Sequence, residues 1–237
     1  AVIAWRVPQH AIGGWRIAAS HSDSPCWKIK ADMPENEGCR RLSVEGYGGM
    51  IMASWLDRPL TVGGRVLVKT PDGVQSRLVY IDRDLLVIPS LAIHFQRDVN
   101  KGKVFNPQID MQPLWGPAGS RTLTDLICEE LGITAEEILD WDLQLITRQA
   151  PVQIGPDNEY FMAPRIDDLE CAATTLLAFL EASGEADSAC APVWAMFDNE
   201  EVGSSSRMGA ESSFLRDVLD RILDAVPHSG QAAARAM

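Results

Sequence analysis

Residues 193–201 read VWAMFDNEE, a short apolar run that leads directly into four polar residues. The run predicts a buried strand, and the apolar residues between Leu215 and Val226 recur at the spacing of an amphipathic helix. A strand, a polar turn and a helix in this order are typical of α/β folds, which bind ligands beyond the carboxyl ends of their strands. This stretch therefore predicts an α/β fold with a polar site at the end of strand 193–197.

The other end of the chain shows a matching pattern. Residues 15–20 alternate large and small apolar side chains and predict a buried strand that ends at His21. Residues 2–5 predict a further buried strand, and the apolar spacing of residues 168–180 predicts a helix. Both ends of the chain thus favour α/β structure.

The middle of the chain is typical of β structure. Residues 60–69 and 74–81 predict a hairpin around Pro71-Asp72-Gly73, and residues 143–146 predict another strand. Residues 122–131 predict a short helix, and a Thr-x-x-Glu capping box at Thr134 predicts a second one. We therefore expect one α/β domain, residues 1–27 and 158–237, with a mainly β domain inserted at residues 28–157.

Composition restricts the function classes. The 237 residues carry a net charge of −12, which disfavours binding to nucleic acid or to anionic membranes. The sequence has no apolar run long enough for a membrane span and no pattern of a signal peptide. Its five cysteines are scattered and never form a CxxC pair, so we expect reduced thiols and a cytoplasmic protein, with Cys171 in the core.

Three polar clusters occupy strand ends or a helix start, and they read His21-Ser-Asp23, Arg165-Ile-Asp-Asp-Leu169 and Asp198-Asn-Glu-Glu201. Each also has a simpler interpretation: a surface turn, a charged helix cap and a solvated acidic turn, respectively. Adjacent glutamates directly after a buried strand are costly unless a cation or a proton offsets them, so a functional site is favoured for the third cluster.

Together the clusters supply one imidazole and several carboxylates, a donor set that suits zinc, manganese or cobalt. An acid two residues after His21 could orient that ring by accepting a hydrogen bond from its other nitrogen. The sequence contains no Gly-x-Ser-x-Gly nucleophile motif, no glycine-rich phosphate loop and no His-Glu-x-x-His helix. Metal chemistry is therefore the class of reaction that these residues favour.

The clusters resemble the aspartyl aminopeptidase and vacuolar aminopeptidase I family of zinc metallopeptidases. Five segments carry the resemblance in the family's order: His21-Ser-Asp-Ser-Pro25, Tyr47-Gly-Gly with Trp55-Leu-Asp57-Arg58, Ile88-Pro-Ser-Leu-Ala-Ile-His94, Arg165-Ile-Asp-Asp-Leu169, and Asp198-Asn-Glu-Glu-Val-Gly-Ser204 followed by Gly209-Ala210 and Ser213-Phe-Leu215. The resemblance implies a metallopeptidase-type α/β catalytic domain with an inserted β-rich oligomerisation domain that forms dimers.

The resemblance also implies a role for each residue of the clusters. His21 and Glu201 would be zinc ligands, and Asp167 would bridge two zinc ions, with cobalt or manganese as alternatives. Glu200 would be the general base, and Asp23 would orient His21. The implied reaction is hydrolysis of the N-terminal peptide bond of peptides, with acidic N-terminal residues preferred.

His94 lies in the expected insert. The resemblance implies that it binds substrate in the active site of a neighbouring subunit, within a homo-oligomer built from dimers. Without the resemblance, a buried histidine in a strand is the simpler interpretation.

The chain departs from the family pattern in two respects. Asp168 stands where the family has asparagine, which adds a negative charge beside the bridging acid. Two further family ligands, an aspartate and a histidine, are expected after Met237, so we expect a fragment that lacks both ends. A catalytically incomplete fragment or non-catalytic oligomerising homologue is therefore the alternative function, and a related dinuclear amidohydrolase with a different insert is a weaker one.

Overall fold

In the computed structural model, the apolar run 193–197 lies in strand β13 (Cys190–Phe197), the centre of a three-stranded sheet. β13 pairs in parallel with β2 (Gly14–His21) and antiparallel with β1 (Val2–Trp5). The parallel register places Phe197 opposite His21, so both strands end at the same edge of the sheet. The structure describes residues 1–8, 11–30, 35–36, 38–182 and 190–226.

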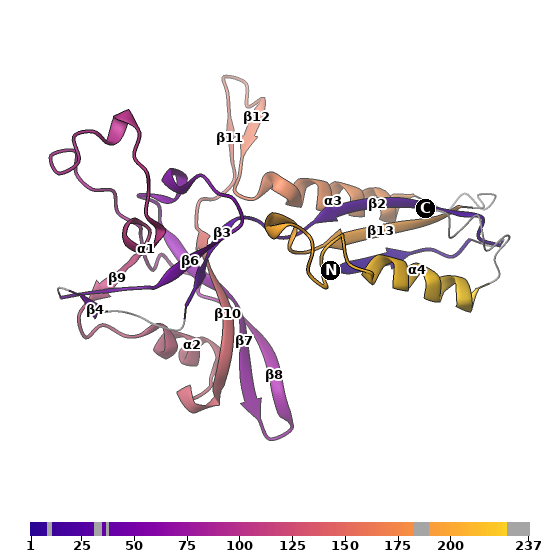
Figure 1. The fold of residues 1–237 in the computed structure, drawn as a ribbon, viewed down its shortest axis with the longest axis horizontal. Coiled ribbons are helices and arrows are strands. Elements are labelled where there is room, and N and C mark those ends of the chain that lie inside the picture. Colours follow the sequence, from indigo (N-terminus) through magenta and orange to yellow (C-terminus); the bar gives the residue numbers. More distant parts are fainter. Residues whose placement is uncertain (9–10, 31–34, 37, 183–189, 227–237) are drawn as a thin grey trace. The chain divides into compact units, whose positions relative to one another are not determined.

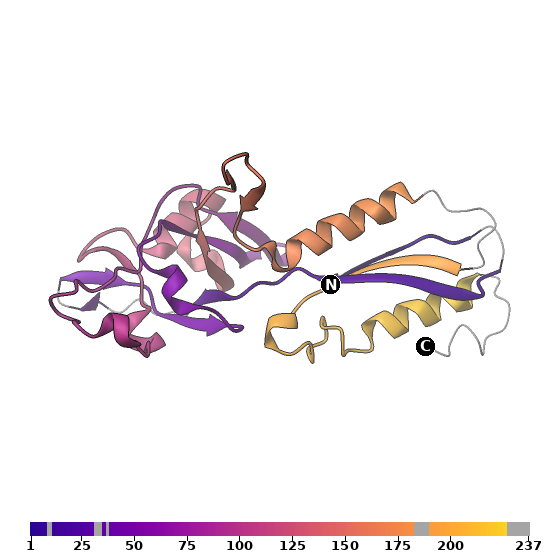
Figure 2. The same ribbon diagram turned by 90° about the horizontal axis from the view of Figure 1, so that it is seen from above.

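Two helices cover opposite faces of this sheet, α3 (Ile166–Glu181) and α4 (Phe214–Ala225) (Figure 2). α4 places Ile222 and Leu223 in a buried cluster with Trp15 of β2 and Val193 of β13. This unit therefore has three layers, with the sheet between two helices, and the predicted α/β class is confirmed.

The described chain divides into two units. One unit combines Ala1–Ser24 with the chain from Arg165 onward and holds the three-stranded sheet, and the other is Pro25–Pro164. The insert expected at residues 28–157 lies within the second unit. None of the described helices combines the length and the apolar character that a membrane span requires.

A five-stranded antiparallel sheet forms the second unit's main layer (Figure 1), with its strands in the order β6 (Val44–Tyr47), β3 (Cys26–Ile29), β10 (Ile138–Thr147), β7 (Leu60–Thr70) and β8 (Gly73–Tyr80). Helix α2 (Leu123–Leu131) adds Leu123, Leu126 and Ile127 to the core of this unit. The smaller elements are β4 (Glu35–Asn36), β5 (Cys39–Arg41), β9 (Leu114–Pro117), the short helix α1 (Pro107–Asp110) and the hairpin of β11 (Val152–Ile154) and β12 (Tyr160–Met162).

Several local predictions are confirmed. The hairpin around residues 71–73 joins β7 to β8, and Thr122 caps α2 through a capping box with Asp125. The helices predicted at residues 168–180 and 215–226 are α3 and α4. Residues 227–237, which the expected α/β domain includes, lie outside the described residues.

Three expectations are wrong. The capping box at Thr134 opens only a single 3₁₀ turn, Ala135–Glu137, after which the chain enters β10 because this strand pairs with β7 over its whole length. Cys171 is exposed on α3, not in the core. β1 and β2 are strands but not buried throughout, since Val2 and Trp5 of β1 and Ile17 of β2 are exposed.

Gly64 in β7 is a point where the second unit tolerates no side chain. Its φ is +149°, and a Cβ there would lie 2.2 Å from the backbone oxygen of Asp142 in β10. We expect Gly64→Ala to lower the free energy of unfolding by about 2 kcal/mol or more, because backbone atoms of a paired strand must move. Urea unfolding measures the change.

Gly73→Ala is the matched control for Gly64→Ala. Gly73 also has a positive φ, +116°, but no atom lies within 4 Å of the added Cβ. Its cost should be about 1 kcal/mol, the backbone contribution alone. Equal losses in the two variants would contradict the proposed clash in β7.

Candidate metal centre

His21 is the last residue of β2, and its ring is held from one side by Asp23. Nδ1 of His21 lies 3.1 Å from the backbone oxygen of Asp23 and 3.3 Å from its Oδ1. Both side chains are largely buried, with 14% and 7% of their surface exposed. Two acceptors near Nδ1 favour the tautomer with the ring hydrogen on Nδ1, which leaves Nε2 as the nitrogen that could bind a metal.

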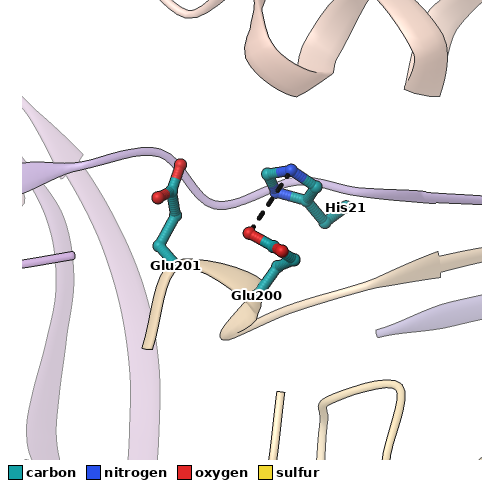
Figure 3. Close-up of side chains that lie close together, drawn as sticks. All are labelled: His21, Glu200 and Glu201. Atoms are coloured by element: carbon teal, nitrogen blue, oxygen red, sulfur yellow. Dashed lines mark ion pairs between the residues drawn. The ribbon is translucent and has the colours of Figure 1, made fainter. Parts of the chain in front are cut away.

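Nε2 of His21 faces acidic side chains from two other elements. It lies 3.3 Å from Oδ1 of Asp167, at the start of α3, and 3.8 Å from Oε2 of Glu200, in the 3₁₀ turn Glu200–Val202 after β13. One donor atom each of His21, Glu200 and Glu201 lie within 4.8 Å of one another (Figure 3). Bonds from zinc to nitrogen or oxygen are about 2 Å long, so small side-chain movements would let these three atoms surround one ion.

Asp23 also holds the glutamate pair in place. Its Oδ1 accepts a hydrogen bond from the backbone N–H of Glu200 at 3.2 Å, and its Oδ2 accepts one from that of Glu201, also at 3.2 Å. The same carboxylate therefore contacts the imidazole after β2 and the turn after β13. This single side chain joins the ends of two strands that are far apart in the sequence.

The charges of the site affect one another strongly. Partial burial alone would lower the pKa of His21, but the carboxylates of Asp168, Asp23 and Glu200 raise it above its ordinary value. Burial raises the pKa of Glu201, and the charges of Asp167 and Glu200 raise it further. Several acidic groups thus compete for one imidazole as their counter-charge.

Asp168, the residue after the expected bridging acid, contacts the backbone of His21. Its Oδ2 accepts a hydrogen bond from the backbone N–H of His21 at 3.1 Å. Burial would raise the pKa of Asp168, but hydrogen bonds from Cys171 and from the His21 N–H bring it below its ordinary value. The peptide bond between Asp167 and Asp168 is cis, and the carbonyl oxygen of Asp167 accepts a hydrogen bond from Ser24 Oγ at 3.1 Å.

The donor set fits a divalent transition-metal ion. An imidazole nitrogen with a free lone pair and nearby carboxylate oxygens are the ligands that zinc accepts in hydrolytic sites. Asp167 is 86% exposed and Glu200 is exposed as well, so both can turn toward an ion without leaving a packed environment. A bound cation would also offset the mutual repulsion of the carboxylates that raises the pKa of Glu201.

The structure therefore brings together five of the six residues that the sequence marked, His21, Asp23, Asp167, Glu200 and Glu201. The sixth, His94, belongs to the other unit, where it is exposed in a turn at residues 93–95. The simpler interpretation of His94 as a buried strand histidine is wrong.

Two further residues of the site's surroundings were missed in the sequence. Asn199 precedes the glutamates with a positive φ of 61°, and its Oδ1 accepts a hydrogen bond from Ser206 Oγ at 2.7 Å. An asparagine between a strand and a glutamate pair is a signal for a left-handed residue, because asparagine tolerates that conformation better than most residues.

The chain is thus an α/β protein in which two parallel strands end at an imidazole and several carboxylates, a candidate metal site. Comparison with known proteins identifies the family. The chain belongs to the family described as aminopeptidase I zinc metalloprotease (M18), which it matches over residues 1–237.

Curated relatives support this assignment. The chain is 41% identical over 245 residues to a probable M18 family aminopeptidase 2 of Streptomyces avermitilis, covering 100% of this chain and 56% of the relative. It is 39% identical over 219 residues to a protein of the same name from Clostridium acetobutylicum, covering 89% of this chain and 50% of the relative. The chain thus spans about half the length of these relatives.

Solved structures share the fold. The cryo-EM structure of an Ape4 and Nbr1 complex matches with a TM-score of 0.87 and 34% identity, over 98% of this chain and 49% of that one. The structure of mApe1 from Chaetomium thermophilum matches with a TM-score of 0.83 and 32% identity, over 98% of this chain and 57% of that one. An M18 family aminopeptidase from Thermotoga maritima matches with a TM-score of 0.79 and 27% identity, over 94% of this chain and 51% of that one.

Proposed function

We propose that this chain is part of a zinc aminopeptidase that removes N-terminal residues, with acidic residues preferred, and that it supplies ligands to a site for two metal ions. The observation that carries the proposal is the convergence of acidic side chains on His21: Oδ1 of Asp167 lies 3.3 Å from its Nε2, and donor atoms of His21, Glu200 and Glu201 lie within 4.8 Å of one another. In this proposal His21, Asp167 and Glu201 are ligands of the two metal ions, and the remaining ligands come from the part of the protein that the relatives contain and this chain does not.

Glu200, Asp23 and His21 have separate roles in the proposed hydrolysis. When bound, zinc would polarise the scissile carbonyl and favour ionisation of water. Glu200 accepts a proton from the attacking water while the water oxygen bonds to the carbonyl carbon. Glu200 then gives that proton to the amine nitrogen as the C–N bond breaks, so no net proton remains on the enzyme. Asp23 keeps Nδ1 of His21 protonated, so that Nε2 points its lone pair toward the metal.

The second unit has a separate role in the proposal. We assign it to oligomerisation through dimers, with His94 contacting the substrate of a neighbouring subunit. The exposed position of His94 supports this assignment, as does one related structure, the mApe1 dodecamer of S. cerevisiae, which is 25% identical to this chain. The scattered cysteines, none of which forms a disulfide in the described chain, support a cytoplasmic location.

The test compares a longer protein that contains this chain with the chain alone. The longer protein, loaded with zinc or cobalt, should cleave aspartyl or glutamyl anilides faster than leucyl anilide, and a chelator should abolish cleavage. The 237-residue chain should bind metal weakly and show no turnover. Absence of metal-dependent cleavage by the longer protein would favour the alternative, a non-catalytic oligomerising homologue. Strong activity of the chain alone would contradict the proposal that ligands come from elsewhere.

A further inference from the structure

The turn that carries the glutamate pair depends on one residue in an unusual conformation. Asn199, directly before Glu200, lies in the left-handed region with φ 61° and ψ 25°. Residues other than glycine adopt this region at a cost, which is smaller for asparagine than for most, so contacts with the surroundings help to hold it. The directions in which Glu200 and Glu201 leave the sheet follow from this one pair of backbone angles.

Hydrogen bonds from both sides hold Asn199. Its N–H bonds to Asp198 Oδ1 at 2.9 Å, and its carbonyl oxygen accepts from the N–H of Ser204 at 2.8 Å. Its side-chain Oδ1 accepts from Ser206 Oγ at 2.7 Å. Among these bonds, the one from Ser206 joins two side chains; the same Oγ also accepts a hydrogen bond from the N–H of Met208 at 3.3 Å, within the segment that carries Ser206.

The segment that carries Ser206 is itself fixed by backbone contacts. The N–H of Gly209 bonds to the carbonyl oxygen of Ser206 at 3.0 Å, and the N–H of Asp198 bonds to that of Met208 at 3.1 Å. The chain closes so tightly that a Cβ on Gly209 would lie 2.0 Å from the carbonyl oxygen of Ser204. Ser206 is therefore attached to a rigid segment and can hold Asn199 in place.

We propose that Ser206 is a positioning residue for the metal centre, acting through the side chain of Asn199. It keeps the turn in the one conformation in which Asp23 accepts the N–H groups of Glu200 and Glu201 and both carboxylates approach His21. The effect on the turn is independent of metal. The effect on zinc affinity rests on the proposed function.

Hydrogen exchange of the metal-free chain tests the effect on the turn. Ser206→Ala should speed exchange of the Glu200 and Glu201 amides about fivefold and leave the amides of β13 unchanged, since one hydrogen bond between neutral side chains has a net contribution of that size. Ser206→Thr, which keeps the hydroxyl, should retain slow exchange. Ser205→Ala is the matched control, because Ser205 is an exposed serine next in the chain, and it should behave as wild type. Unchanged Glu200 and Glu201 amides, or equally faster exchange in β13, would overturn the proposal.

A double-mutant cycle separates this role from general stability. Glycine adopts the left-handed region at no steric cost, so in an Asn199→Gly background the Ser206→Ala change should have no further effect on exchange at the turn. An undiminished effect in that background would contradict action through Asn199.

Zinc titration of the same variants tests whether Ser206 affects the zinc affinity of the site. Loss of an outer contact commonly weakens metal binding about 10- to 100-fold, and we expect about a tenfold weaker affinity for Ser206→Ala, with recovery in Ser206→Thr. If exchange changes as expected but the wild-type chain binds no zinc at all, the proposed function fails and the role of Ser206 in the turn is supported. If zinc binds with equal affinity to wild type and Ser206→Ala, the metal part of the proposal is wrong.

Discussion

Replacement of Glu200 by glutamine is expected to reduce the turnover of an aspartyl anilide about 100- to 10,000-fold in the longer protein, the range typical for loss of a general acid–base group. The side chain keeps its size and one oxygen but can no longer accept a proton from water at neutral pH. Zinc content should stay near that of the wild type, because in the proposal His21, Asp167 and Glu201 hold the metal. Steady-state kinetics and metal analysis of the purified variant measure the two quantities.

Two further variants distinguish the role of Glu200 from that of Glu201 and from a general effect of replacing a glutamate. Glu211→Gln makes the same chemical change at an exposed position in the same segment and should leave both quantities unchanged. Glu201→Gln should lose zinc as well as activity, since it removes a proposed ligand. If Glu200→Gln lost zinc and Glu201→Gln kept it, the roles of the two glutamates would have to be exchanged. Near-normal activity of Glu200→Gln would show that neither the base nor its assignment is correct.

The part of the fold that carries the site could be predicted because its signals are local and agree with each other. The apolar run 193–197, the polar turn and the spacing of residues 215–226 each favour the structure that forms, β13 and α4. The prediction failed at Thr134, where the capping box does form but the helix does not continue. After the 3₁₀ turn, β10 pairs with β7 and places Leu143 and Leu145 in the core of the second unit. This long-range packing outweighs the local helix signal.

The burial of individual helix positions was harder to predict. The spacing of α3 predicts an apolar face, yet Leu169, Leu177 and Leu180 are exposed in the described structure. A periodic pattern shows which residues share a face of a helix, but it does not show whether another element covers that face.

The convergence of the clusters followed from general sheet geometry, but the contacts that hold the site could not be predicted. Parallel strands end at the same edge of a sheet, which brings His21 and the turn after Phe197 together. Nothing in the local sequence indicates that Asp23 bonds to two amide groups 177 and 178 residues away, because such bonds depend on the backbone angles at Asn199. Short motifs thus indicate the candidate residues, whereas the contacts that hold them emerge only from the three-dimensional fold.

Asp23→Ala should lower the zinc affinity of the site about 10- to 100-fold, more than any other change outside the proposed ligands. The substitution removes three contacts at once: one of the two acceptors near Nδ1 of His21 and the acceptors for the N–H groups of Glu200 and Glu201. The ring then keeps only the backbone oxygen of residue 23 as its acceptor, and the turn loses the group that satisfies its amides. Competition with a coloured zinc chelator measures the affinity.

The graded variant Asp23→Asn separates these contributions. Asparagine offers one side-chain oxygen instead of two, so it can still accept from the imidazole or from one amide, but not from all three groups. Its affinity should therefore fall between those of wild type and Asp23→Ala. Asp72→Ala removes the same charge from an exposed turn of the second unit and should not change zinc affinity, which excludes a general effect of net charge. If Asp23→Ala bound zinc as tightly as wild type, the two strand ends would be held by other contacts, and Asp23 would have no part in building the metal centre.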